Sequence, residues 1–178
     1  MSIPPHSFRE NVVAQGGAAG LPSPDACTHL TGADHVASLT AALADVRRHV
    51  GTLDRWGRLV AEVLGRRGRM LAAGNGGSAA QAQHLTAELV GRYRADRPPF
   101  SAICLTAETS SLTAIVNDYP ADELFARQVE AHGREGDVLV LLSTSGRSPN
   151  VVTAARRGRE LGMTVLATPM PHMGIFPH

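Results

Sequence analysis

The 178-residue sequence is poor in aromatic residues, in cysteine and in net charge. Aromatic side chains make up 4% of it and the net charge is +1, so it lacks both the stacking surfaces and the basic surplus of nucleic-acid-binding proteins. Its two cysteines, Cys27 and Cys104, lie far apart without metal-ligand spacing, which favours a reduced cytosolic protein. We therefore expect no nucleic acid among its partners.

Long apolar runs are also lacking. No run approaches the roughly 20 residues that a membrane-spanning helix needs. The first residues, MSIPPHSFREN, place prolines, a histidine and charges where a signal peptide has its apolar core. These absences predict a soluble, cytoplasmic protein with no membrane attachment.

Hydrophobic residues make up 43% of the sequence, enough for the core of one domain. Residues 1–32 are rich in proline and glycine, and we interpret them as a flexible leader. From residue 34 apolar residues recur at spacings of three and four, which predicts an amphipathic helix interrupted by Gly51 and continued by a second helix at 53–64. The last residues, 169–178, contain three prolines and are interpreted as an irregular tail. One folded domain, residues 33–168, is thus expected.

Short apolar runs alternate with helical patterns over the rest of that domain. Strands are predicted at residues 70–73, 100–105, 137–142 and 163–167. Helices are predicted at residues 78–93, 108–116, 122–134 and 149–161. This alternation implies an α/β fold in three layers, a doubly wound parallel sheet covered by helices on both faces. The prolines after Ala167 predict no helix or central strand there, although such a domain would normally continue.

The first candidate site is a glycine-rich loop at residues 74–78, GNGGS, between a predicted strand and helix. Gly76 and Gly77 would let backbone N–H groups approach an anion, and the positive end of the helix would favour it. Ser78 is expected to cap the helix and to donate its hydroxyl. The loop is neither a dinucleotide fingerprint nor a Walker loop, so no nucleotide cofactor is expected. An ordinary tight turn explains the motif equally well.

The second candidate site is a serine-rich loop at residues 143–148, STSGRS, which directly follows the most apolar predicted strand. Ser148 is expected to be the N-cap of the next helix, with Pro149 at the favoured first position. Four hydroxyls would then gather at the carboxyl end of a central strand, where open α/β sheets bind ligands: Ser143, Thr144, Ser145 and Ser148. This predicts a site for a phosphate monoester, with an ordinary polar loop as the less favoured reading.

Three side chains spaced by four residues follow the first loop: His84, Glu88 and Arg92. On one helix they would share a face, where His84 and Glu88 suit proton transfer or a divalent metal. From spacing alone a solvated face with a Glu88–Arg92 ion pair is the favoured interpretation.

These motifs, with AQHLTAELVGRYR and the segment NDYPADELFARQVEAHGREGDVLVLLSTSGRSPNVV, resemble the sugar isomerase (SIS) domain, and within it the phosphoheptose isomerases. The resemblance covers residues 36–166. It implies a flavodoxin-like, five-stranded parallel sheet in a homotetramer whose active sites lie between subunits. It also implies the conversion of sedoheptulose 7-phosphate into D-glycero-D-manno-heptose 7-phosphate through an enediol.

The resemblance implies roles for particular residues. The sugar phosphate would be held by Ser78, Ser143, Thr144, Ser145 and Ser148. Asn75 and Asp118 would line the sugar chain, and Arg92 matches an arginine of the family's site. Gly76 and Gly77, whose backbone would approach the phosphate, complete the substrate-binding residues. Glu88 would be the catalytic glutamate, and His84 would act beside it or bind zinc, as in some members.

The sequence departs from the family at its end. There, members continue with a strand and a long helix that carries an aspartate, a glutamine and a second catalytic histidine. His172 and His178 do not match that motif, which leaves any Zn²⁺ an incomplete set of His84 and Glu88. The alternative function is a non-catalytic SIS module that binds a phosphosugar or a protein, as in a replication-initiator-associating relative. Glu88 and STSG favour the enzyme lineage, whereas the missing helix favours the binding module.

Overall fold

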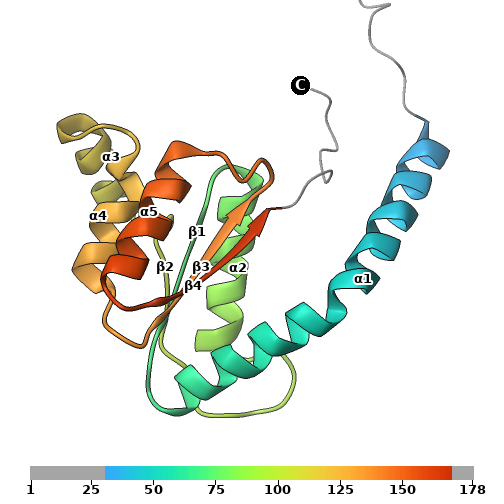
Figure 1. The fold of residues 1–178 in the computed structure, drawn as a ribbon, viewed down its shortest axis with the longest axis horizontal. Helices are drawn as coiled ribbons and strands as arrows, with labels where there is room; N and C mark the ends of the chain where they lie inside the picture. The colour runs from blue at the N-terminus through green and yellow to red at the C-terminus, as the bar shows by residue number, and fades with distance from the viewer. Residues whose placement is uncertain (1–30, 170–178) are drawn as a thin grey trace, which may run out of the picture.

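The computed structural model describes residues 31–169, so most of the predicted leader and of the predicted tail lies outside the described residues. The described chain folds into a parallel sheet with helices on both sides (Figure 1). Its elements are α1 Gly32–Gly65, β1 Met70–Gly74, α2 Gly77–Val90, β2 Ala102–Cys104, α3 Thr109–Asp118, α4 Glu123–His132, β3 Val138–Ser143, α5 Pro149–Glu160 and β4 Thr164–Pro169. The four strands have the order β2-β1-β3-β4 and all pair in parallel. The predicted α/β, doubly wound architecture is confirmed.

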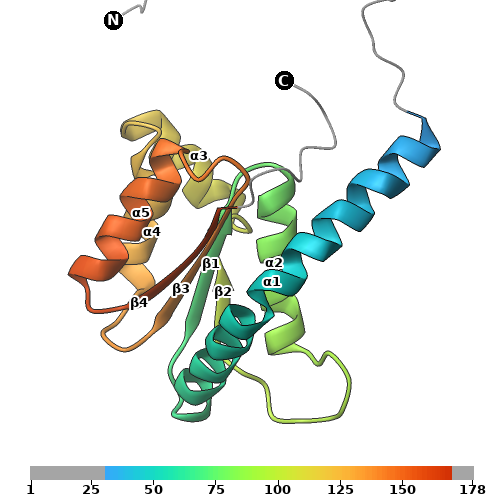
Figure 2. The same ribbon diagram turned by 45° about the vertical axis from the view of Figure 1, so that its right-hand side comes forward.

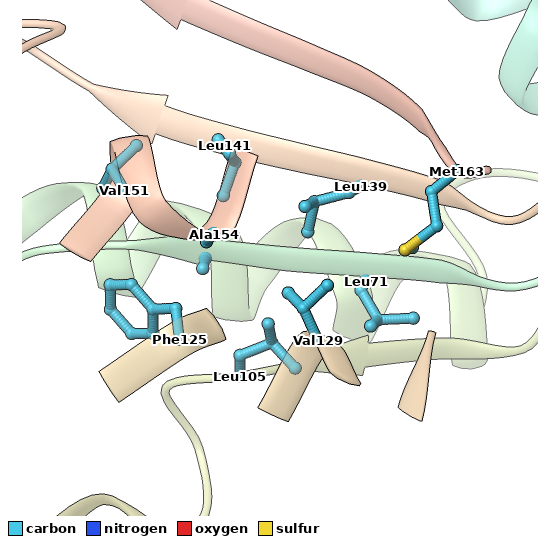
Figure 3. Packing of buried hydrophobic residues seen from close by; sticks show 10 residues of the cluster. Leu71, Leu105, Phe125, Val129, Leu139, Leu141, Val151, Ala154 and Met163 are labelled. Carbon is cyan, nitrogen blue, oxygen red and sulfur yellow. The ribbon is translucent and has the colours of Figure 1, made fainter. Parts of the chain in front are cut away.

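The strand β1 shows how one short sequence serves two cores. Side chains alternate across a strand, so Leu71 and Ala73 point to one face and Met70 and Ala72 to the other. The first pair joins a cluster with α4 and α5, in which Phe125, Val129, Leu139 and Met163 are buried (Figure 3). The second pair joins a cluster with α1 and α2 that includes Val63, Leu64 and Ala82. Because both faces are covered, β1 and β3 are built of apolar residues and glycine, up to Ser143 at the end of β3.

The helix α1 corrects the expected interruption at Gly51. It runs unbroken over 34 residues and begins with a capping box between Thr31 and Asp34. A glycine inside a helix costs only about 1 kcal/mol, and the apolar spacing continues across it through Val50 and Leu53. A single unfavourable residue therefore does not end a helix of this length.

The two ends of α1 have different surroundings. Its C-terminal turns pack against the sheet through Val63 and Leu64, whereas its N-terminal half projects away from the body (Figures 1 and 2). From Val36 to Leu53, α1 carries an apolar stripe whose members are 44–65% exposed: Val36, Leu39, Leu43, Val46, Val50 and Leu53. In the part of the chain described here, no helix combines the length and apolarity needed to cross a membrane.

The strand β4 extends further than predicted, to Pro169, which stands opposite Ser143 of β3. Within the described residues β4 pairs with β3 alone and forms one side of the sheet. A proline has no N–H to donate, but on a strand with an unpaired side that loss is tolerated.

Candidate functional site

The two candidate loops meet at the carboxyl edge of the sheet. Strands β1 and β3 are direct neighbours in parallel register, with Gly74 opposite Leu142. The first loop (residues 74–78) leaves β1 and the second loop (residues 143–148) leaves β3, each leading into a helix. The strand order thus brings together two segments about 70 residues apart in the chain.

A pair of amides joins the first loop to the first turn of α5, directly after the second loop. The Asn75 Nδ2 donates to Asn150 Oδ1 at 3.0 Å, and the Asn150 Nδ2 donates back to Asn75 Oδ1 at 2.9 Å. Asn150 Oδ1 also accepts from the N–H of Val151 at 2.9 Å, which ties the pair to the first turn of α5. Asn75 was predicted to line the site, whereas its partner Asn150 was missed, because pairing across the sheet leaves no local pattern.

The first loop depends on glycine. A Cβ atom on Gly74 would lie 2.7 Å from Ser78 Cβ and 2.8 Å from the Leu142 carbonyl oxygen, so no other residue fits without displacing the backbone. Gly76 has φ +53° and is the N-cap of α2. The prediction that Ser78 caps the helix is wrong, because α2 already begins at Gly77. The Ser78 side chain is therefore not used as a cap.

The second loop is shaped by its own hydroxyls. The buried Ser143 Oγ accepts from the N–H of Gly146 at 3.1 Å, and Ser145 Oγ accepts from the N–H of Arg147 at 3.2 Å. Gly146 has φ +63°, which suits glycine at this turn. A hydroxyl oxygen that accepts a bond keeps its own O–H free to donate, so both serines remain available to an anion.

The start of α5 agrees with the prediction in position but not in bonding. Ser148 is the N-cap and Pro149 is the first helical residue, yet the Ser148 side chain makes no capping bond. Its carbonyl oxygen accepts from Val151 and Val152, each at 3.0 Å. The half-buried Ser148 hydroxyl is therefore not used to cap the helix, and neither is the Thr144 hydroxyl on the exposed loop.

The helix α2 carries His84 and Glu88 on one face. His84 Nε2 lies 3.5 Å from Glu88 Oε1, and the two side chains are 76% and 31% exposed. The expectation that Arg92 shares this face is wrong, since α2 ends at Val90 and Gly91 turns the chain away. The predicted ion pair between Glu88 and Arg92 does not occur among the ion pairs of the described residues. Glu88 faces His84 instead.

A hollow of about 730 Å³ runs along this face of α2. It is lined by Ala80, Gln81, His84, Leu85, Glu88, Leu89, Tyr93 and Arg97. Arg97 was also missed by the sequence reasoning, because it lies in a loop beside two prolines with no motif around it. The hollow combines a carboxylate, an imidazole and a guanidinium with an apolar wall.

Asp118 stands apart from these groups. It is the last residue of α3, is exposed, and accepts from the neighbouring Asn117 Nδ2 at 2.7 Å. The structure does not bring it into hydrogen-bond contact with either loop. Its predicted place along the sugar chain stays a prediction.

A third loop of the same edge follows β2, the other neighbour of β1. There Glu108 caps α3, and its carboxylate accepts from the N–H groups of Ser110 at 3.0 Å and Ser111 at 2.5 Å. Hydrogen bonds from Ser111, and next from Ser110, lower the pKa of Glu108 to about 2. This carboxylate is therefore charged at neutral pH and committed to holding the helix start.

The described residues offer a metal too few ligands. His84 and Glu88 form a pair, and no group of three or more His, Cys, Asp or Glu side chains that could hold a metal occurs among residues 31–169. Protein zinc sites use three or four protein ligands. The residues present thus do not fit a complete zinc site.

The parallel sheet in the order 2-1-3-4, with two strand-to-helix loops side by side at its carboxyl edge, defines a flavodoxin-like α/β domain. Residues 34–168 match the SIS domain family, and the chain belongs to that family.

Several similar proteins carry the name phosphoheptose isomerase. One from Streptomyces coelicolor is 65% identical over 133 residues, 75% of this chain and 58% of its own length. One from a Bradyrhizobium species is 52% identical over 137 residues, covering 69% of its own length. The chain thus spans little more than half of the Streptomyces relative.

Solved structures give the same result. The phosphoheptose isomerase of Neisseria gonorrhoeae superposes with a TM-score of 0.71 at 43% identity, over 76% of this chain and 71% of the other. That of Francisella tularensis superposes with a TM-score of 0.69 at 32% identity, over 77% and 74%. The resemblance drawn from the motifs is confirmed in sequence and in fold.

Proposed function

We propose that this chain is a phosphosugar isomerase that converts sedoheptulose 7-phosphate into D-glycero-D-manno-heptose 7-phosphate. The observation that carries the proposal is the helix α2, which begins at the first loop and presents Glu88 beside His84 further along. The first loop and Glu88 thereby share one helix, while the pairing of β1 with β3 sets the second loop beside the first. The relatives named phosphoheptose isomerase support the same reading.

In this proposal the two loops bind the phosphate. The starts of α2 and α5 carry partial positive charge and point at the same edge, which favours an anion. The phosphate oxygens would accept from the hydroxyls of Ser78, Ser143, Thr144, Ser145 and Ser148. The backbone of Gly76 and Gly77 would approach the phosphate, the sugar chain would lie along Asn75 and Asp118, and Arg92 would be a further substrate-binding residue. Binding energy from the phosphate, away from the reacting carbons, would position the substrate.

Glu88 would carry out the proton transfer. As a carboxylate it takes a proton from C1 of the ketose, which gives the enediol, and then returns a proton to C2 to form the aldose. The hydroxyl proton of O1 must move to O2, and His84, 3.5 Å from Glu88, is the group placed to exchange oxygen protons. No atom is gained or lost, so the reaction needs no redox cofactor.

We further propose that any bound Zn²⁺ would contact His84 and Glu88, where it would supply Lewis-acid polarisation of a carbonyl. Two ligands are too few for a closed zinc site, so no step above depends on the metal. Metal analysis of the purified protein, with His84→Ala as the comparison, checks this point. Equal zinc content in the two proteins contradicts it.

The isomerase proposal is tested by binding and turnover together. Millimolar sedoheptulose 7-phosphate is expected to raise the melting temperature, because a ligand that binds only the folded state stabilises it. A coupled assay is expected to show turnover that Glu88→Gln abolishes while the melting shift persists. No melting shift contradicts phosphosugar binding. A shift with equal zero rates in both proteins favours the alternative, a non-catalytic SIS module.

We also propose a cytoplasmic homo-oligomer, a tetramer by the family resemblance. The apolar stripe of α1, which repeats at spacings of three and four, is the pattern by which helices pair. Leu43→Glu is expected to give a smaller species in analytical ultracentrifugation, whereas Ala44→Glu, exposed but off the stripe, should not. A monomeric wild-type protein contradicts this assembly.

A further inference from the structure

Arg97 lines the hollow beside Glu88, and its guanidinium closes the C-terminus of α2. Its Nη2 donates to the carbonyl oxygen of Glu88 at 2.6 Å. Its Nη1 donates to the carbonyl oxygens of Leu89 at 2.9 Å and of Pro98 at 3.0 Å. The guanidinium carbon also lies 4.6 Å from the centre of the Phe100 ring, a cation–π distance.

These contacts supply hydrogen-bond donors to carbonyl groups at the end of the helix. The last four carbonyl groups of a helix lack partners within it, and a cation near them is favoured by the helix dipole. In α2 the carbonyl of Ala87 accepts from the N–H of Gly91 at 2.8 Å, and that of Leu89 accepts from the N–H of Phe100 at 3.1 Å. The Glu88 carbonyl is satisfied by Arg97, a residue nine positions further along the chain.

The contact matters because Glu88 is the residue whose backbone is held. We propose that Arg97 is a positioning residue for Glu88, fixing the last turn of α2 so that the Glu88 carboxylate keeps its place in the hollow. The proposal rests on the isomerase function proposed above. A base must lie within hydrogen-bond reach of the proton that it takes, and a displacement of about 1 Å can lower a rate roughly a hundredfold.

The chain contains a matched control for this role. Arg134 Nη1 donates to the carbonyl oxygens of Ala131 at 3.1 Å and Gly133 at 2.7 Å, and so closes the end of α4 in the same way. The α4 helix lies on the opposite face of the sheet from α2 and carries no residue of the proposed site. Arg134→Met thus removes a similar cap without touching Glu88.

The experiment compares Arg97→Met, Arg97→Lys and Arg134→Met with the wild-type chain. Two measurements are made: amide hydrogen exchange of the segment 84–93 without ligand, and kcat and KM for sedoheptulose 7-phosphate. In Arg97→Met we expect faster exchange in that segment and a kcat roughly tenfold to a hundredfold lower, with KM within about threefold of the wild-type value. Arg97→Lys, which keeps one donor cation, is expected to recover part of both losses.

Arg134→Met is expected to have a lower melting temperature than the wild type. Its amide hydrogen exchange in the segment 84–93 and its kcat are expected to stay at wild-type values. The proposal is overturned if Arg97→Met exchanges like the wild type, if its kcat stays within twofold, or if Arg134→Met lowers kcat as much. A wild-type chain without turnover counts against the isomerase function alone. The exchange comparison then decides the Arg97 proposal, because faster exchange in Arg97→Met but not in Arg134→Met supports it and equal exchange overturns it.

Discussion

The two loops that meet at the carboxyl edge of the sheet are shaped by different means. The first loop requires residues without side chains, since Gly74 has no room for a Cβ and Gly76 takes a positive φ. The second loop is stabilised by its own side chains, since the hydroxyl oxygens of Ser143 and Ser145 accept hydrogen bonds from backbone N–H groups of the loop. A glycine loop is therefore sensitive to any added side chain, whereas a hydroxyl loop is sensitive to the loss of one. Substitutions in each loop test this contrast.

Gly74→Ala is expected to be the most damaging change. Its Cβ would meet Ser78 Cβ at 2.7 Å and the Leu142 carbonyl oxygen at 2.8 Å, both part of rigid elements. We expect a loss of about 2–3 kcal/mol in the free energy of unfolding, measured by urea denaturation. Gly77→Ala is the control, because a Cβ there meets nothing within 4 Å and alanine suits a helix. Equal losses in the two variants would contradict a steric origin.

Ser143→Ala is the corresponding test of the second loop. It removes the acceptor of the Gly146 N–H, which is expected to cost about 1 kcal/mol in the free energy of unfolding, the net contribution of one hydrogen bond. Thr144→Ala, on the exposed next residue, is expected to change stability by less than about 0.5 kcal/mol. Denaturation of the two variants side by side decides the matter, and the reverse order would refute a loop shaped by the Ser143 hydroxyl.

Asn75 and Asn150 test whether the loops act as one unit. Each of Asn75→Ala and Asn150→Ala is expected to lower stability by about 0.5–1.5 kcal/mol, because both donate to and accept from each other. In a double-mutant cycle the double variant should lose less than the sum of the single losses. Additive losses would mean that the two loops are independent of each other.

Glu108 should give the smallest effect, because its carboxylate is exposed, and that effect should disappear at low pH. The pKa of Glu108 is lowered from 4.5 to about 2 by bonds from Ser111 and Ser110, so its charge stabilises the folded state above pH 4.5. That contribution is lost as the pH falls from about 4.5 toward 2. Glu108→Gln is therefore expected to have a flatter stability profile in this window. A profile parallel to the wild type would show that the cap contributes nothing.

The order of elements and the position of both loops follow from local sequence. The apolar run DVLVLL predicts a central strand because a strand buried on both faces excludes polar residues, and β3 lies at Val138–Ser143. The glycine motif and the serine motif predict turns because their residues suit positive φ or bind the backbone. The helix ends are predicted less accurately. The predicted interruption at Gly51 is absent, and α2 ends at Val90 and not at residue 93. At those points the cost of a glycine in a helix, about 1 kcal/mol, is close to the gain from packing the neighbouring residues as helix. Local sequence therefore does not decide where the helix ends.

Local sequence patterns are enough to predict the α/β class, the two loops and the presence of Glu88 with His84 on one helix. Tertiary structure alone decided which loops are neighbours, since the order β2-β1-β3-β4 sets Asn75 against Asn150 across 75 residues of chain. It also decided that Arg97 closes α2 above Glu88 and that Arg92 lies beyond the helix. The physical reason is the range of the interactions: turns and strands are set by contacts within a few residues, whereas a shared site is set by strand pairing and side-chain caps between distant segments.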